Sequence, residues 1–206
     1  MGLSLWEFDN EYRGCGYKHV CGVDEAGRGP LAGPVFAAAV ILPADIEIEG
    51  LNDSKKISEK KRDKLFDIIC EKALAYSVAS STEREIDEIN ILNASLLAMK
   101  RAVSGLVIPP DTILVDGNQI FESEIHIESV VKGDSLSASI AAASILAKVS
   151  RDRYMLELSK KYPEYMLEKH KGYPTKLHYE CVEAYGISEI HRKSFFKKYK
   201  GGVLLK

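Results

Sequence analysis

Long apolar runs are missing from this chain of 206 residues. The longest uninterrupted run, residues 35–42, is far too short to cross the hydrocarbon core of a bilayer. Near the N-terminus, Glu7, Asp9 and Glu11 closely follow the few apolar residues, which is not the pattern of a signal peptide. The sequence therefore predicts a cytoplasmic protein without a membrane partner.

A large excess of charge of one sign is also missing. The chain carries 28 lysines and arginines against 30 aspartates and glutamates, which gives a net charge of −2. The field of the whole molecule therefore does not indicate a polyanionic partner. Any site for a nucleic acid has to be a local basic patch.

Paired cysteines are a third absence. The four cysteines have neither C-x-x-C spacing nor a histidine at zinc-finger spacing, and they stand at positions 15, 21, 70 and 181. We expect reduced thiols that serve mostly as packing residues. With 46% hydrophobic and 28% charged residues, the composition is that of an ordinary globular protein. The length suffices for one domain with a real core.

Two adjacent carboxylates, Asp24 and Glu25, end a strand-like run that begins at Val20, and a glycine-flanked arginine, Arg28, follows. Neighbouring strand residues point to opposite faces. The two carboxylates can therefore share a ligand only if the strand ends or bulges there, or if a metal reaches both. The alternative is a solvated acidic turn. A dinucleotide-binding loop is excluded, because the spacing is not G-x-G-x-x-G and a second strand-like run follows instead of a helix.

Strands and helices alternate along the rest of the chain. Ser58 is predicted to cap one helix, and Thr82 and Glu85 form a capping box for the next. The apolar stripe of that second helix is predicted to face the core through Ile89, Leu92, Leu96, Met99 and Val103. Further elements are predicted as strands over 20–23, 35–42, 75–80, 113–115 and 125–130, and as helices over 136–158 and 176–184.

Four acidic residues are predicted to meet at one edge of the resulting α/β sheet. Asp24, Glu25 and Asp116 stand at the carboxyl ends of strands, where ligands gather in such sheets. Asp134 stands at a strand-to-helix junction, and for this residue a helix cap is the alternative. Carboxylates without histidine or cysteine companions suit Mg²⁺ or Mn²⁺. Two such ions about 3.5–4 Å apart stabilise the attacking and leaving oxygens in phosphodiester cleavage.

The run D-E-A-G-R-G-P-L-A-G-P-V at 24–35 opens a series of motifs with a family likeness. V-D-G at 115–117, K-G-D at 132–134 and S-I-A-A-A-S-I-L-A-K-V at 139–149 follow in order. G-Y-P-T at 172–175 and H-R-K-S-F at 191–195 complete the series. From about Val20 to Phe196 the chain resembles ribonuclease HII. The G-R-G loop and the few residues before Gly22 favour this type over the type three ribonucleases H.

The resemblance implies a ribonuclease H-like fold, in which helices flank a central mixed β-sheet and a small helical region lies at the C-terminus. It implies a metal-dependent endonuclease, a hydrolase that acts in DNA replication and repair. The substrates would be the RNA strand of RNA–DNA hybrids and duplex DNA cut 5′ to an embedded ribonucleotide. The products would carry 3′-hydroxyl and 5′-phosphate ends.

Roles for single residues also follow from the resemblance. The four carboxylates would be catalytic and would bind the metal, as two ions of Mn²⁺ or Mg²⁺ during the reaction. Gly27, Arg28 and Gly29 would contact the nucleic-acid backbone and the 2′-hydroxyl, and Tyr173 would pack on the ribose. Separately from the resemblance, lysines in or near segments that flank the acidic site are predicted to hold phosphates or else to be solvated: Lys55, Lys56, Lys148, Lys169 and Lys171.

The predicted organisation has three parts. Residues 1–19 form an N-terminal extension without reliable periodicity, residues 20–160 form the catalytic domain, and residues 161–206 form a helical and basic segment packed on that domain. The Phe195-Phe196 pair lacks the glutamine and the aliphatic residue of a sliding-clamp peptide, so clamp binding is not supported. Separately, we expect a monomer.

Two other classes of function stay open at this point. A different polynucleotidyl transferase of the same fold would share the carboxylates but not the G-R-G loop and Tyr173. A nucleic-acid binder without activity would not need four converging acids. Metal-dependent cleavage of a hybrid duplex separates the three.

Overall fold

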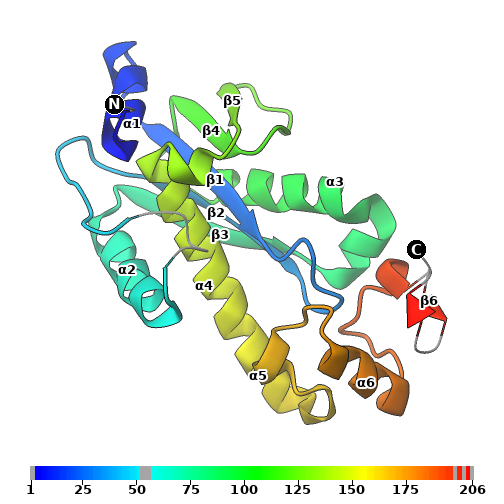
Figure 1. Ribbon diagram of the computed structural model, residues 1–206. Helices are drawn as coiled ribbons and strands as arrows, with labels where there is room; N and C mark the ends of the chain where they lie inside the picture. The colour runs from blue at the N-terminus through cyan, green and yellow to red at the C-terminus, as the bar shows by residue number, and fades with distance from the viewer. Residues whose placement is uncertain (1–2, 52–56, 197–198, 201–202, 205–206) are drawn as a thin grey trace.

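A five-stranded mixed sheet forms the centre of the computed structural model, which describes residues 3–51, 57–196, 199–200 and 203–204 (Figure 1). Strand β2 runs antiparallel to β1 and β3, whereas β1, β4 and β5 run parallel, in the order β3-β2-β1-β4-β5. The strands are β1 (Val20–Ala26), β2 (Val35–Ile41), β3 (Ala75–Ser81), β4 (Thr112–Asp116) and β5 (His126–Val130). The five predicted strands and the mixed α/β sheet are confirmed.

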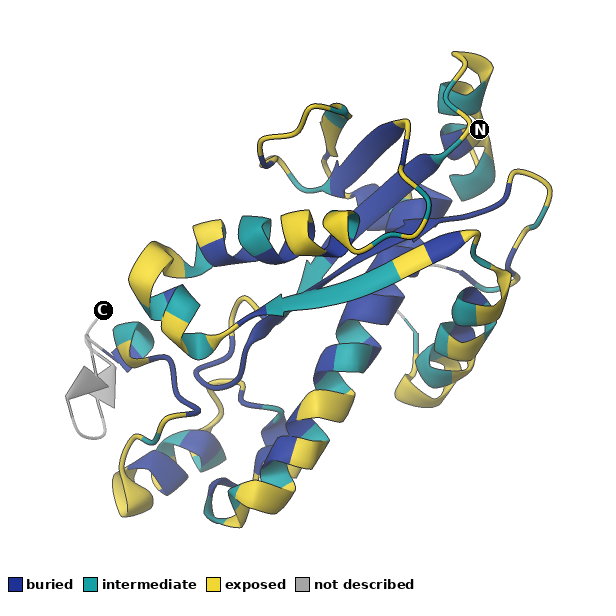
Figure 2. Ribbon diagram, turned by 180° about the vertical axis from the view of Figure 1, so that it is seen from behind, coloured by how far each residue is buried: buried dark blue, intermediate teal, exposed yellow. Residues whose placement is uncertain are grey.

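Helices cover both faces of this sheet. Helix α3 (Glu83–Ser104) lies on one face with its buried side toward the strands, as Figure 2 shows from behind. Helix α4 (Ala138–Lys161) crosses the other face, and α2 (Glu59–Lys72) packs beside it. In the part of the chain that the structure describes, no helix is both long and apolar enough to cross a membrane.

The small residues of α4 allow it to lie unusually close to β1. A Cβ atom on Gly22 would lie 2.1 Å from the backbone carbonyl carbon of Ser139. No side chain fits between these two backbones, which explains why β1 needs glycine at this point. The same contact fixes the position of the two residues that follow on β1, Val23 and Asp24.

The predicted caps are confirmed. The Ser58 hydroxyl accepts a hydrogen bond from the Lys61 backbone at the start of α2. Thr82 and Glu85 form the capping box of α3, in which each side chain bonds to the other residue's backbone. Helix α4 begins after Ser137, whose hydroxyl accepts from the Ile140 backbone.

The predicted apolar stripe of α3 is wrong in part, because the helix is interrupted. Asn90 has φ 67° and ψ 166°, and its side chain accepts a hydrogen bond from the Asn93 backbone, so it starts a second helical segment. Asparagine tolerates a positive φ and is a good cap. The interruption changes the phase of the stripe: Ile89 is exposed and Met99 is buried, and the core is lined by Ile86, Ala94, Ala98, Met99 and Ala102.

The N-terminal extension contains a helix that the sequence did not predict, α1 (Leu5–Gly14), with a capping box from Ser4. Its buried carboxylate, Asp9, accepts hydrogen bonds from the Ser137 hydroxyl and from the backbone and hydroxyl of Ser139. Helix α1 is therefore attached to the first turn of α4, more than a hundred residues later in the chain.

A small helical region closes the fold beyond the far end of α4, as the resemblance implied (Figure 1). Its own hydrophobic cluster joins α4 to this region through Met155, Tyr165, Leu167 and Phe196, with Leu31 from the segment after β1. Its elements are η2 (Pro163–Tyr165), α5 (Leu167–His170), α6 (Lys176–Tyr185), η3 (Lys193–Phe196), β6 (Tyr199–Lys200) and β7 (Val203–Leu204).

Candidate active site

Asp24 and Asp116 lie side by side where two parallel strands separate. The register pairs Val23 of β1 with Val115 of β4, so the next residue on each strand is an aspartate. Strand β1 continues to Ala26 against β2 alone. Asp24 therefore has its nearest strand neighbour among the acidic residues in Asp116, whereas Glu25 follows it within the continuing strand, so the condition that a metal must reach both Asp24 and Glu25 stays a prediction.

The environment of Asp24 disfavours its negative charge. Burial, followed by the nearby charges of Glu25 and Asp116, raises the pKa of the Asp24 carboxyl well above its usual range. Hydrogen bonds from the Ser144 hydroxyl and from the Glu25 backbone, the latter at 2.7 Å, favour the ionised form and oppose this shift. Three carboxylates therefore repel one another at the end of β1.

Asp134 joins the group from a short 3-10 turn, η1 (Gly133–Ser135). Its backbone N–H lies 3.4 Å from a carboxylate oxygen of Asp116. Gly133 allows this approach, because a Cβ atom there would lie 2.6 Å from the Ile140 side chain and 3.3 Å from the same oxygen. The cap of α4 is Ser137, so the alternative that Asp134 caps this helix is wrong.

The donor set suits a hard divalent cation. All four side chains offer carboxylate oxygens. Besides burial, the repulsion from Glu25 and Asp116 raises the pKa of Asp24, and a bound cation would relieve that repulsion. The arrangement of these side chains is less complete than their ligand chemistry. Among the described residues, no three acidic, histidine or cysteine side chains surround one point as a finished metal cage.

Two buried arginines hold the glycine loop that follows β1. Arg192 donates to the carbonyls of Gly27, Arg28 and Gly33 at 2.7, 2.9 and 2.8 Å. Arg151 of α4 donates to the carbonyls of Ala32, Pro34 and Lys171 at 3.1–3.2 Å. Burial, followed by the charge of Arg151, lowers the pKa of Arg192 to about 9. The carbonyl oxygens of the loop thus point inward.

Gly27 is the position where this arrangement requires glycine. It has φ +99°, and a Cβ atom there would lie 2.1 Å from Nε of Arg151. Gly29 has no such constraint from the protein, since nothing lies within 4 Å of a Cβ atom at that position. Arg28 is exposed, and its guanidinium lies 3.5 Å from the Glu25 carboxylate.

The loop that carries Tyr173 lies against the glycine loop. The Leu31 backbone donates to the Gly172 carbonyl at 2.8 Å, and a Cβ atom on Gly172 would lie 2.6 Å from the Ala32 carbonyl oxygen. Tyr173 is 38% exposed. Cations of two α4 residues lie over this ring, Nζ of Lys148 at 5.5 Å and Cζ of Arg151 at 5.6 Å from the centroid.

A pocket of about 410 Å³ joins these parts. Its lining combines one carboxylate, the glycine loop, the hydroxyl partner of Asp24 and the tyrosine, namely Glu25, Ala26, Gly27, Arg28, Ser144, Lys148 and Tyr173. Lys148 also forms an ion pair with Asp152 at 2.7 Å. The structure thus brings most of the predicted site residues together, although Lys55 and Lys56 lie outside the described residues.

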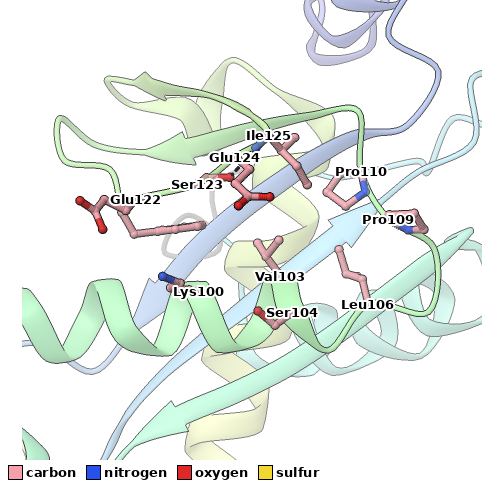
Figure 3. Close-up of a pocket in the computed structure, with 11 residues that line it drawn as sticks. Lys100, Val103, Ser104, Leu106, Pro109, Pro110, Glu122, Ser123, Glu124 and Ile125 are labelled. Carbon is pink, nitrogen blue, oxygen red and sulfur yellow. Dashed lines mark hydrogen bonds between the residues drawn. The ribbon is translucent and has the colours of Figure 1, made fainter.

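A larger pocket, of about 750 Å³, lies elsewhere (Figure 3). It is bordered by the end of α3 and the segment between β4 and β5, with Val103, Leu106 and Ile125 pointing into it. It contains none of the predicted site residues. Size alone would therefore have placed the site wrongly.

Comparison with known proteins identifies the family. The ribonuclease HII family model matches residues 21–198. The chain belongs to the ribonuclease HII family. It is 56% identical to the ribonuclease HII of Caldicellulosiruptor bescii over 94% of both chains. It is 59% identical to that of Dechloromonas aromatica over 85% of this chain and 90% of the relative. The protein is therefore a nuclease, a hydrolase with ribonuclease H activity, and not a binder without activity.

Solved structures share the fold. Ribonuclease H2 of Pyrococcus horikoshii superposes with a TM-score of 0.70 at 31% identity, over 85% of this chain and 92% of that one. A ribonuclease HIII solved with Mn²⁺ has a TM-score of 0.63 at 19% identity, over 82% of this chain and 63% of that one. The ribonuclease HII of Archaeoglobus fulgidus, solved as a complex with PCNA, has a TM-score of 0.69 at 23% identity, over 88% and 95%. The last two show the fold alone, so the absence of clamp binding and the monomeric state both stay predictions.

Sequence reasoning missed three residues that support the site. Ser144 bonds to Asp24, and the signal for it was a polar residue inside the alanine-rich run of α4. Arg151 and Arg192 were assigned no role: Arg192 stands in the H-R-K-S-F motif of the resemblance, but an arginine in a basic segment is usually exposed, so neither was expected to support the loop. Both are fully buried.

Proposed function

We propose that this ribonuclease HII hydrolyses the RNA strand of RNA–DNA hybrids and cuts duplex DNA on the 5′ side of an embedded ribonucleotide. The products carry 3′-hydroxyl and 5′-phosphate ends. The observation that supports this most directly is that Asp24 and Asp116 directly follow the last paired residues of two parallel strands, Val23 and Val115. The pocket beside them has space for a sugar and an aromatic ring to cover it.

The reaction depends on divalent cations, Mg²⁺ or Mn²⁺, and two ions are used during catalysis. Asp24, Glu25, Asp116 and Asp134 would hold them. Bound there, they would activate a water molecule for attack and would stabilise the charge that develops on the attacking and leaving oxygens. Cation binding favours the ionised form of Asp24, so it releases protons wherever the raised pKa keeps this carboxyl protonated.

Residues of the loops select the ribose. A 2′-hydroxyl both donates and accepts a hydrogen bond, and backbone groups can reach it where glycine leaves the strand accessible. Gly27 and Gly29 serve this purpose in our proposal, with Arg28 on the phosphodiester backbone. Tyr173 packs against the sugar, and Lys148 binds a phosphate. The same phosphate-binding role stays a prediction for Lys55 and Lys56.

A DNA duplex with one ribonucleotide tests the proposal. With Mg²⁺ and, separately, with Mn²⁺ we expect a single incision 5′ to the ribonucleotide, and chelation should abolish it. An otherwise identical all-DNA duplex is the control and should remain intact. Incision elsewhere, or cleavage that persists in chelator, would contradict the proposed specificity or the proposed metal dependence.

A further inference from the structure

Three of the five histidines are buried together beneath the Tyr173 loop. They come from three separate segments: His170 ends α5, His178 lies in α6 and His191 precedes η3. The rings of His170 and His178 stack with centroids 4.3 Å apart. The Nε2 atoms of His178 and His191 face each other at 3.2 Å.

The hydrogen bonds of the outer two rings fix where their protons lie. In His170, Nδ1 accepts from the Gly172 backbone at 3.2 Å, so the ring proton is on Nε2 and is donated to the Tyr165 carbonyl at 3.0 Å. In His191, Nδ1 accepts from the Ser188 backbone at 3.1 Å. Its proton is therefore on Nε2 as well, and it points at His178.

The state of His178 then follows by complementarity. Because His191 donates from Nε2, Nε2 of His178 must accept, and the proton of His178 is on Nδ1. That N–H donates to the Tyr173 carbonyl at 3.0 Å. Protonation of any one ring would place an N–H group against another donor. Burial lowers the pKa of His178 and of His191 to about 4, helped by the charge of His170 on His178 and that of His178 on His191, which agrees with neutral rings.

The side chain of Tyr173 is held in place mainly through its backbone. The residue is 38% exposed, so packing restrains its side chain only in part. Its backbone N–H donates to the His170 carbonyl at 2.9 Å, and its carbonyl accepts from the His178 ring at 3.0 Å and from the Thr175 backbone at 2.8 Å. Two of these three restraints come from the histidine cluster, and the Gly172 carbonyl in turn accepts from Leu31 of the glycine loop.

We propose that His178 is a positioning residue for the ribonuclease reaction, which acts by holding the Tyr173 carbonyl through its Nδ1–H group. This inference rests on the proposed role of Tyr173 at the ribose. His191 acts one step further out, because it fixes the tautomer of His178. A displacement of about 1 Å in a group that orients the substrate can cost on the order of a hundredfold in rate.

Two substitutions at His178 separate the donor from the volume of the ring. In His178→Asn the amide nitrogen stands near the position of Nδ1 and can still donate to the Tyr173 carbonyl. In His178→Gln the amide reaches toward the position of Nε2, and this donor is lost. We expect the Asn variant to keep the single-turnover rate on the one-ribonucleotide duplex within about fivefold and the Gln variant to lose roughly 10- to 100-fold. Duplex affinity without divalent metal should stay the same in both.

A double-mutant cycle shows whether His178 acts through Tyr173. In a Tyr173→Ala background, His178→Gln should cost no further rate. An equal loss in both backgrounds would overturn the inference and leave the proposed function intact. If Tyr173→Ala alone cleaved this duplex at the wild-type rate, the ribose role of Tyr173 would fail, and the positioning role of His178 with it.

The unmodified protein gives an independent readout that does not depend on how the variants fold. Nitrogen-15 NMR of the histidine rings at neutral pH should show three neutral rings in this cluster. His178 should carry its proton on Nδ1, and His170 and His191 should carry theirs on Nε2. A neutral His178 with its proton on Nε2 would overturn the inference whatever the kinetics show.

Discussion

At the scale of single residues, Asp24 combines burial with surroundings of like charge. Its pKa is raised, so at neutral pH the folded protein bears an electrostatic cost that the unfolded chain does not. A buried carboxylate among like charges lowers the stability of the folded protein. Such residues are expected at functional sites.

Neutralising this charge should therefore improve stability and remove activity. We predict that Asp24→Asn raises the urea midpoint in chelator above pH 7 and that the difference from wild type shrinks as pH falls and Asp24 itself becomes protonated. Cleavage should be undetectable. The measurement is a set of urea titrations between pH 5 and 8, and a variant less stable than wild type at pH 8 would contradict the argument.

Asp134 and Ser137 lie three residues apart, and substitutions at them should have opposite effects on stability and on cleavage. Asp134→Asn should keep the stability but lose most of the cleavage, because the cap of α4 is Ser137. Ser137→Ala should lower the free energy of unfolding by about 1–2 kcal/mol, the usual cost of a lost cap, while the folded fraction stays active. Near-wild-type turnover of Asp134→Asn with saturating Mn²⁺ would remove it from the catalytic set.

Gly27 and Gly29 form a second matched pair. Gly27→Ala combines a strained φ with a clash against Arg151, so it should cost about 1–3 kcal/mol of stability as well as activity. Gly29→Ala meets nothing in the protein and should leave the urea midpoint unchanged. A lower rate of Gly29→Ala on the one-ribonucleotide duplex would then report close approach of the substrate, and an unchanged rate would speak against it.

At the scale of elements, the position of the carboxylates depends on how close α4 lies to β1. Gly22→Ala would push a methyl group into the backbone at Ser139, so we predict a loss of more than about 3 kcal/mol or failure to fold. Gly14→Ala at the end of α1 meets nothing within 4 Å and serves as the control. Urea unfolding of both variants checks this, and equal midpoints would show that α4 moves aside without cost.

Local signals in the sequence were sufficient for most elements. Ser58 and Thr82 predict where helices begin because a cap is a contact with residues two or three positions away. The interruption at Asn90 was missed because the apolar residues on both sides continue the same spacing across it. Helix α1 was missed although Ser4 and Glu7 form a local capping box, and its buried anchor, Asp9, gave no local signal because its partners lie about 130 residues away.

At the scale of the whole molecule, the candidate site was partly predictable for a related reason. Carboxylates at the ends of predicted strands must come together once the sheet forms, and the sequence therefore indicated Asp24 and Asp116 in advance. The supports of the loops have no such pattern. Arg192 and His178 donate to backbone carbonyls. Every residue has such a carbonyl, so the residue types in the sequence do not indicate which one is bonded.

The histidine cluster should also make stability depend on pH. The folded-state pKa of His178 and of His191 is about 4, below the ordinary value of 6.5. Between pH 4 and 6.5 the unfolded chain binds protons that the folded protein does not. The contribution of the neutral histidines to the free energy of unfolding is therefore complete above pH 6.5 and is lost as pH falls toward 4. Each histidine should contribute a slope of at most about 1.4 kcal/mol per pH unit. Urea titrations at pH 4.5, 5.5 and 6.5 should show a smaller slope for His178→Asn, and an unchanged slope would contradict the assignment.

The contact between Arg192 and the Gly27 carbonyl spans 165 residues of chain and has a consequence for biosynthesis. A ribosome that adds about 5–20 residues per second needs roughly 8–33 s to pass from one residue to the other. During that interval the glycine loop has been synthesised, but the guanidinium that orients its carbonyls has not. The nascent chain therefore carries Asp24 and Glu25 without a finished loop until the segment that contains Arg192 has been made.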